Sequence, residues 1–127
     1  MSGRIFLVGI FGLFGVFSRY YLGIAAFKFY PNPFPFGTFL INILGSFLIG
    51  VIYVVGIERS MISENLRVAI SVGFLGGFTT FSAYSLESVS LLNDARYLMA
   101  LLYWGLSPVF GALAAFIGIS LARVLVR

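Results

Sequence analysis

Three polar residues, Thr38, Asn42 and Ser46, recur at four-residue spacing inside an otherwise apolar stretch of the chain. On a helix this spacing places them in one stripe, with Gly45 beside it. The amide of Asn42 offers two hydrogen-bond donors without a formal charge. Such a group can bind a small anion and release it again, whereas a buried lysine would hold the anion too tightly. The alternative is a hydrogen bond that merely joins two helices, and we weigh it equally.

A second group, Tyr103, Ser107 and Gly111, repeats the four-residue spacing near the end of the chain. Two hydroxyl groups on one helix face are consistent with a second wall of hydrogen-bond donors. A packing face of small residues with one interfacial tyrosine is at least as common an explanation.

Aromatic residues lie between these two groups. Phe74, Phe78 and Phe81 are spaced to share one helical face, and such a stripe ordinarily packs or faces lipid. The edge of an aromatic ring is electropositive, so edges turned into a pore would stabilise a small dehydrated anion. Phe81 and Tyr84, three residues apart, are the pair best placed for this role.

Two charged residues, Arg19 and Glu87, lie well inside apolar stretches. Ionisable groups at membrane depth are costly and ordinarily face a partner or a water-filled path. We expect either a structural Arg19–Glu87 pair or an Arg19 that lines a vestibule and raises the local anion concentration.

The composition places these groups in a membrane protein. Of the 127 residues 61% are hydrophobic and 9% charged, against roughly 45–50% and about 25% in average soluble domains. The chain has no cysteine or histidine, which removes disulfides, thiolate nucleophiles, zinc sites and the commonest general base. The net charge of +4 comes from scattered basic residues without a basic face. We therefore expect neither an enzyme nor a nucleic-acid-binding protein.

Four apolar stretches must position these side chains. About 20 helical residues cross a bilayer, so four spans occupy most of the chain and predict a single transmembrane domain over residues 1–127. The first apolar run is longer than the core of a signal peptide, and we keep it as a helix. The short connections predict antiparallel neighbours. The expected spans are residues 5–29, 37–57, 66–92 and 97–125.

The third span is interrupted at residues 73–82, which read GFLGGFTTFS. Non-helical backbone at membrane depth requires other protein or a water-filled cavity to satisfy its freed carbonyls, so a break with a functional use is predicted. A close helix crossing would suit the same small residues equally well. Ser63 is expected to cap this span, with Glu64 in its first turn, and Pro108 is expected to kink the fourth.

We expect the protein in the plasma membrane, or in the inner membrane of a cell with two membranes. The basic residues indicate its orientation there. The side of the termini carries five arginines and the other side two basic residues: Arg4, Arg59, Arg67, Arg123 and Arg127 against Lys28 and Arg96. This modest excess favours cytoplasmic termini.

Over essentially its whole length the chain resembles the Fluc family of fluoride channels, also called CrcB. The resemblance lies in GTFLINILG at residues 37–45, in the 73–82 run with Ser85 and Glu87 beyond it, and in Arg19. It implies an antiparallel, dual-topology dimer with two pores that export cytoplasmic fluoride passively. The partners it implies are fluoride, the lipid bilayer, a sodium ion and a second copy of the same chain.

The resemblance also assigns roles to single residues. The carbonyls of Gly76 and Thr79 would hold a structural sodium ion at the centre of the dimer. The pore would be lined by Asn42, Phe81, Tyr84, Ser82, Tyr103 and Ser107. The chain departs from the family at Tyr84, where phenylalanine is usual, and at Ala83, where threonine is common. The extra hydroxyl would bind fluoride or alter the local hydrogen bonding, and it leaves a dimer of two different chains as an alternative.

The main alternative function is a small dual-topology, proton-coupled multidrug exporter. Such a protein needs a titratable acid in the membrane, for which Glu87 is the candidate, and the first span contains no acid. A non-transporting assembly subunit is a third class. It would leave Asn42, Phe81 and Thr79 without a shared purpose.

Overall fold

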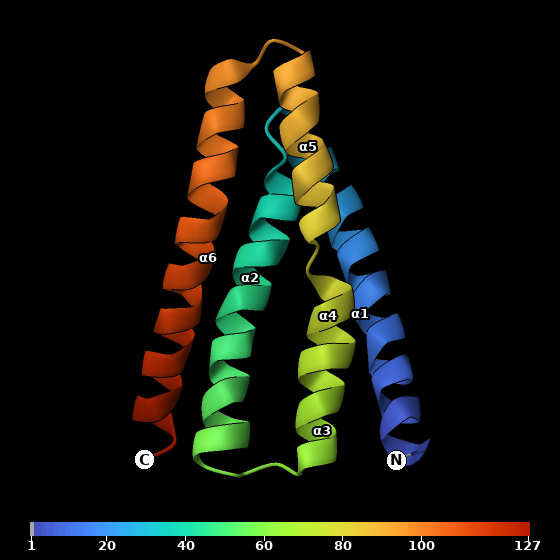
Figure 1. The fold of residues 1–127 in the computed structure, drawn as a ribbon, viewed down its shortest axis with the longest axis vertical. Coiled ribbons are helices and arrows are strands. Elements are labelled where there is room, and N and C mark those ends of the chain that lie inside the picture. The colour runs from blue at the N-terminus through green and yellow to red at the C-terminus, as the bar shows by residue number, and fades with distance from the viewer. Residues whose placement is uncertain (1) are drawn as a thin grey trace.

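The computed structural model describes residues 2–127, and over that range the chain is helical apart from short connections. Four helical segments are long and apolar enough to cross a membrane: Ser2–Phe29, Phe36–Glu58, Glu64–Asn93 and Tyr97–Leu125. Both chain ends lie at one end of the molecule, beside the loop that joins the second and third segments (Figure 1). The predicted four-helix membrane architecture is confirmed, with the first three spans slightly longer than expected.

The first and last spans are continuous helices, α1 (Ser2–Phe29) and α6 (Tyr97–Leu125), and Pro108 lies inside α6. The second span is α2 (Phe36–Tyr53) followed by the π-helical turn η1 (Val54–Glu58). The third comprises α3 (Glu64–Val68), the π-helical turn η2 (Ala69–Phe74), α4 (Leu75–Phe78) and α5 (Phe81–Asn93). The apolar pattern did not predict the π-helical turns, which are often found at functional sites.

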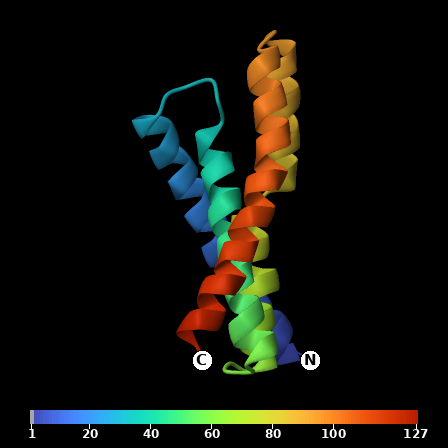
Figure 2. The same cartoon turned by 90° about the vertical axis from the view of Figure 1, so that its left-hand side faces the viewer.

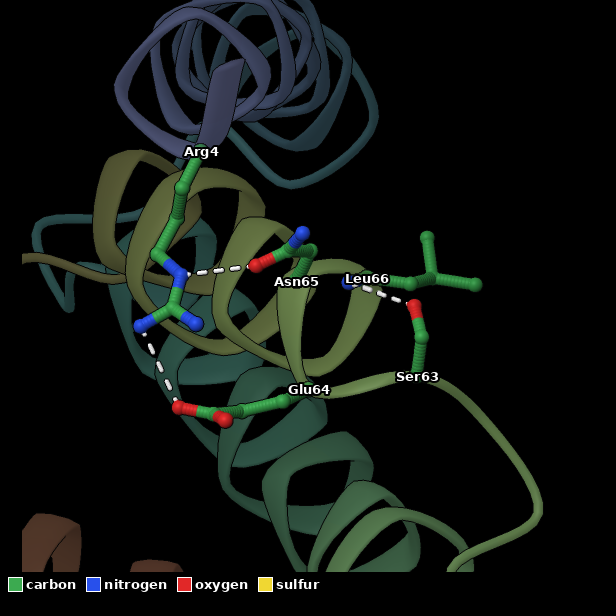
Figure 3. Close-up of polar contacts among 5 residues, drawn as sticks. All are labelled: Arg4, Ser63, Glu64, Asn65 and Leu66. Carbon is green, nitrogen blue, oxygen red and sulfur yellow. Dashed lines mark hydrogen bonds and ion pairs between the residues drawn. The ribbon is translucent and has the colours of Figure 1, made fainter. Parts of the chain in front are cut away.

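The third span begins with the predicted cap. Ser63 has extended backbone, and its Oγ accepts a hydrogen bond from the Leu66 amide at 3.3 Å, with Glu64 in the first turn (Figure 3). Arg4 of α1 pairs with Glu64 at 3.1 Å and donates to Asn65 Oδ1 at 2.8 Å. These contacts fix the start of the third span against α1.

An ion pair fixes the other side of the same loop. Arg123, near the end of α6, donates two hydrogen bonds to the carboxylate of Glu58 at the end of η1. The loop between the second and third spans is therefore attached to the first helix and to the last.

Glycines allow the helices to approach closely. A Cβ atom on Gly15 of α1 would collide with the Phe74 carbonyl, and one on Gly77 would lie 2.7 Å from a carbonyl of α1. Gly50 of α2 makes an equally close approach to a carbonyl of α6. Small residues at crossings are typical of helix packing in membranes. The close crossing that we considered as an alternative to the helix break is therefore present together with it.

The two halves of the molecule separate beyond the break in the third span. Figure 2 shows the α1–α2 connection diverging from the α5–α6 pair. Buried hydrophobic side chains form two core clusters among the described residues. They are Ile41, Leu75 and Phe78 in one, and Tyr84, Leu91, Ala100 and Tyr103 in the other.

The expected stripe of Phe74, Phe78 and Phe81 is not formed. Phe74 and Phe78 stack at 5.6 Å, and Phe78 is buried, whereas Phe81 is 78% exposed. The prediction was wrong because two extended residues separate Phe78 from Phe81, so the helical spacing does not continue across them.

Candidate functional site

The break in the third span consists of two extended residues. Thr79 has φ −84° and ψ 156°, and Thr80 has φ −148° and ψ 118°. β-Branched residues accept extended backbone readily, and the Thr80 hydroxyl caps α5 by accepting from the Ala83 amide at 3.2 Å. Gly76 and Gly77 belong to α4, so the break follows the glycines.

The break leaves several backbone carbonyls without their helical donors, and the two predicted for the cation site, those of Gly76 and Thr79, are among them. In an unbroken helix, the amide of Thr80 would donate to the Gly76 carbonyl and that of Ala83 to the Thr79 carbonyl. The Thr80 amide instead donates to Asn42 Oδ1 at 2.8 Å, and the Ala83 amide donates to the Thr80 hydroxyl. Within residues 2–127 the carbonyls of Gly76 and Thr79 therefore have no backbone hydrogen-bond donor.

Asn42 joins α2 to this break. Its Oδ1 accepts from the Thr80 amide, and its Nδ2 donates to the Thr80 carbonyl at 3.0 Å. A Cβ atom on Gly45, one turn further along α2, would collide with the Thr79 side chain, so the break lies directly against α2. The interhelical hydrogen bond that we weighed as an alternative is present. It uses one of the two amide N–H groups and leaves the other.

Arg19 and Glu87 do not pair. Arg19 Nε donates to the Gly77 carbonyl at 3.0 Å, next to the break, and Glu87 accepts a hydrogen bond from the Thr38 hydroxyl at 2.7 Å. The only ion pairs within the described part of the chain lie near the termini and involve Arg4 and Arg123. The structural pair considered from the sequence is therefore wrong, because each group finds a neutral partner on a nearer element.

A cavity of about 490 Å³ lies between α2, the break and α6. Six of the residues predicted for the pore or the cation site line it: Asn42, Gly76, Thr79, Phe81, Tyr84 and Ser107. Four others, Arg19, Ser82, Glu87 and Tyr103, are not among its lining residues. Residues from three separate spans therefore meet at one hollow, as the spacing of polar and aromatic groups suggested.

Ser71 and Pro108 also line this cavity and were not singled out as site residues. Ser71 lies in the π-helical turn η2, where the wider turn shifts the residues that face α2 and α6. No periodicity argument based on 3.6 residues per turn could have placed it there. Pro108 was considered only as a kink.

The two aromatic residues after the break are in contact. The rings of Phe81 and Tyr84 lie 5.8 Å apart at 46°, with Phe81 78% exposed and Tyr84 only 8% exposed. The Tyr84 hydroxyl donates to the Trp104 carbonyl at 2.6 Å. The Phe81 ring is thus exposed at the surface of the molecule, whereas the Tyr84 ring is buried and its hydroxyl is hydrogen-bonded.

Two buried hydroxyl groups lack a partner within residues 2–127: those of Tyr103 and Ser107. Tyr103 is fully buried, with its ring 5.1 Å from that of Tyr84 and 5.4 Å from that of Phe34. Unpaired buried hydroxyls are rare and call for an explanation such as a bound ion or water. Ser107 lines the cavity between α2, the break and α6, and it is the better placed of the two.

Two smaller cavities lie on the other side of the break. Arg19 lines one of about 410 Å³ together with Thr38 and Thr80. Glu87 lines another of about 170 Å³, again with Thr38. The positive charge of Arg19 thus borders an open hollow, as the vestibule hypothesis requires.

The comparisons with known proteins agree with one another. Residues 6–119 match the family described as CrcB-like protein, Camphor Resistance (CrcB). A Geotalea daltonii protein named "Fluoride-specific ion channel FluC" is 40% identical over 119 residues, covering 94% of this chain and 96% of its own. Proteins of the same name are 42% identical in a Synechococcus species and 41% in Trichormus variabilis. They cover 94% and 92% of this chain, and 92% and 86% of their own. The matched region includes the break, Asn42 and the cavity, and the chain belongs to the CrcB family.

Proposed function

We propose that this multi-pass membrane protein is a fluoride-specific ion channel that lets fluoride leave the cytoplasm passively. The observation that carries the proposal is the cavity at the break, which gathers an amide, an exposed aromatic ring and an unpaired hydroxyl from Asn42, Phe81 and Ser107. Relatives named as fluoride-specific channels support the same function.

The chemistry of the lining suits a small anion that has lost much of its water. Neutral donors replace hydration without the strong binding that a lysine would impose, so the ion can move on. The positive edge of an aromatic ring adds attraction without a formal charge. Fluoride accepts short hydrogen bonds, whereas a larger anion such as chloride would be held at a distance from the same donors. Selectivity would follow from this difference in size.

The position of Glu87 distinguishes this proposal from a proton-coupled exporter. None of the described residues that line the cavity at the break is an acid, and Glu87 lines a separate, smaller cavity with Thr38 as its partner. An exporter of that type would need the carboxylate where cation and proton compete for it. The arrangement favours passive anion passage.

Reconstitution in liposomes tests the proposal. Vesicles loaded with potassium fluoride should release fluoride rapidly when a potassium ionophore balances the charge, and only slowly without it. Imposing a proton gradient should leave the rate unchanged, and potassium chloride should give no comparable release. Release that required a proton gradient, or that carried chloride equally well, would contradict the channel.

We further propose that two subunits form the pore as an antiparallel homodimer. Phe81 is 78% exposed on the single subunit although it lines the cavity, so the hollow lacks a wall that a second copy would supply. The carbonyls of Gly76 and Thr79 would then meet their counterparts near the dimer axis. Several carbonyl oxygens are suitable ligands for a sodium ion, which we place there as a structural ion.

Labelling of single cysteines tests the antiparallel arrangement. The chain contains no cysteine, so Ser2→Cys and Arg127→Cys each introduce a unique thiol beside a terminus. The charge excess on the terminal side is modest, so we expect the subunits to insert in both orientations. In intact cells about half of the thiols of each variant should then face outward and react with an impermeant maleimide. Full protection of both variants, or full reaction of both, would show a single orientation.

A further inference from the structure

Tyr84 and Pro108 meet at one backbone carbonyl, that of Trp104. In an α-helix the carbonyl of residue 104 accepts the amide hydrogen of residue 108, and proline has none. The Tyr84 hydroxyl, which comes from α5, donates to this same carbonyl at 2.6 Å. A side chain of the third span therefore supplies the hydrogen bond that proline removes from the fourth.

The surroundings of this contact make the bond important. An unsatisfied carbonyl at membrane depth costs several kcal/mol, because no water is there to replace the missing donor. Tyr84 is 8% exposed, with its ring between those of Phe81 and Tyr103, so the hydroxyl has little freedom to turn elsewhere. Both Tyr84 and Pro108 line the cavity at the break.

We propose that Tyr84 is a positioning residue, whose bond to the proline-freed Trp104 carbonyl fixes the aromatic ring at the cavity wall. Its hydroxyl is consequently not offered to the anion, whereas Ser107 adds an unpaired hydroxyl to the cavity lining. Because this bond holds Tyr84 in place, the Phe81 ring packs against a fixed neighbour, and the anion passage stays narrow. The expected effect on anion selectivity rests on the proposed function as a fluoride channel. The hydrogen bond between Tyr84 and the Trp104 carbonyl does not depend on that proposal.

Labelling of tryptophan tests the bond directly. The chain contains a single tryptophan, so tryptophan labelled with ¹³C at its carbonyl reports on residue 104 alone. In the infrared spectrum of the reconstituted protein, Tyr84→Phe should move the labelled band to higher frequency, because the carbonyl loses its donor. Tyr97→Phe removes an equivalent hydroxyl from an exposed position and should leave the band in place.

A double-mutant cycle ties the effect to the proline. Pro108→Ala provides a helical amide for the Trp104 carbonyl, so adding Tyr84→Phe to this variant should move the band little. A band that did not move in Tyr84→Phe, or that moved equally in both backgrounds, would overturn the proposed bond.

Transport measurements on the same proteins test the positioning role. Tyr84→Phe should lower the ratio of fluoride efflux to chloride efflux, and in the Pro108→Ala background it should lower that ratio no further. If the Trp104 band moved but the ratio of fluoride efflux to chloride efflux did not change, the bond would only stabilise the structure. That result would overturn the positioning role. Loss of fluoride efflux with an unmoved band would instead show that the hydroxyl binds the anion. If the parent protein failed to carry fluoride, the proposed function would fail, while the band would still report the bond.

Discussion

Replacing Asn42 by aspartate is expected to abolish fluoride efflux. The substitution keeps the size of the side chain but replaces its N–H groups with a negatively charged oxygen. A carboxylate about 4 Å from an anion repels it by about 4 kcal/mol at an effective dielectric constant of about 20. Since each 1.4 kcal/mol on a barrier is about tenfold, flux should fall roughly a thousandfold. Fluoride efflux from liposomes at a fixed protein-to-lipid ratio measures the loss.

Two comparisons separate this electrostatic effect from damage to the fold. Asn42 also bonds both backbone groups of Thr80, so the aspartate would place an oxygen against the Thr80 carbonyl. Asn42→Ser removes those bonds yet keeps an uncharged donor, and it should conduct better than Asn42→Asp. Asn93→Asp makes the same chemical change at an exposed position and should conduct like the parent. Parental flux through a well-folded Asn42→Asp protein would remove Asn42 from the anion path.

Replacing Phe81 by isoleucine is expected to reduce fluoride efflux at least about tenfold, the effect of about 1.4 kcal/mol on the barrier. Isoleucine keeps apolar bulk at the cavity wall but has no aromatic ring and hence no positive edge. Phe81 is 78% exposed on the single subunit, so the change removes little packing from it. Efflux should therefore fall while the elution volume in size-exclusion chromatography stays the same.

Phe116→Ile is the matched control for this prediction. Phe116 lies on α6, is 66% exposed and does not line the cavity, so the same loss of a ring should leave the efflux unchanged. Equal losses in the two variants would point to a general effect on the bundle. Undiminished efflux through Phe81→Ile would show that the ring edge contributes nothing to anion passage.

The break in the third span explains why Asn42 and Phe81, the residues of these two predictions, lie at the same cavity. Two extended threonines free the carbonyls of Gly76 and Thr79, and they turn Thr80 toward the Asn42 amide. They also end the helical spacing, so that Phe81 projects outward while Phe78 stays buried. One local departure from helical backbone thus brings an uncharged donor and an aromatic ring to the same cavity.

Much of the fold could be predicted from the sequence alone. Apolar runs of sufficient length require membrane helices, because backbone groups in lipid must be satisfied within the segment. The cap at Ser63 was also predictable, since it depends on neighbouring residues only. The weak helix formers of residues 73–82 left a break and a close helix crossing as equal alternatives, and the location of the break at Thr79 and Thr80 was not predicted.

The tertiary structure decided what depends on residues distant in the chain. No spacing could reveal that Arg19 bonds the Gly77 carbonyl, or that Glu87 is taken by Thr38, because those partners lie about 50 residues or more away. The sequence also left several roles open for the Tyr84 hydroxyl, and only the structure shows that it donates to the Trp104 carbonyl. Periodicity predicts which face of a helix is polar. Which of those polar groups remain unpaired is decided by helix packing, which brings donors and acceptors from different spans within hydrogen-bonding distance.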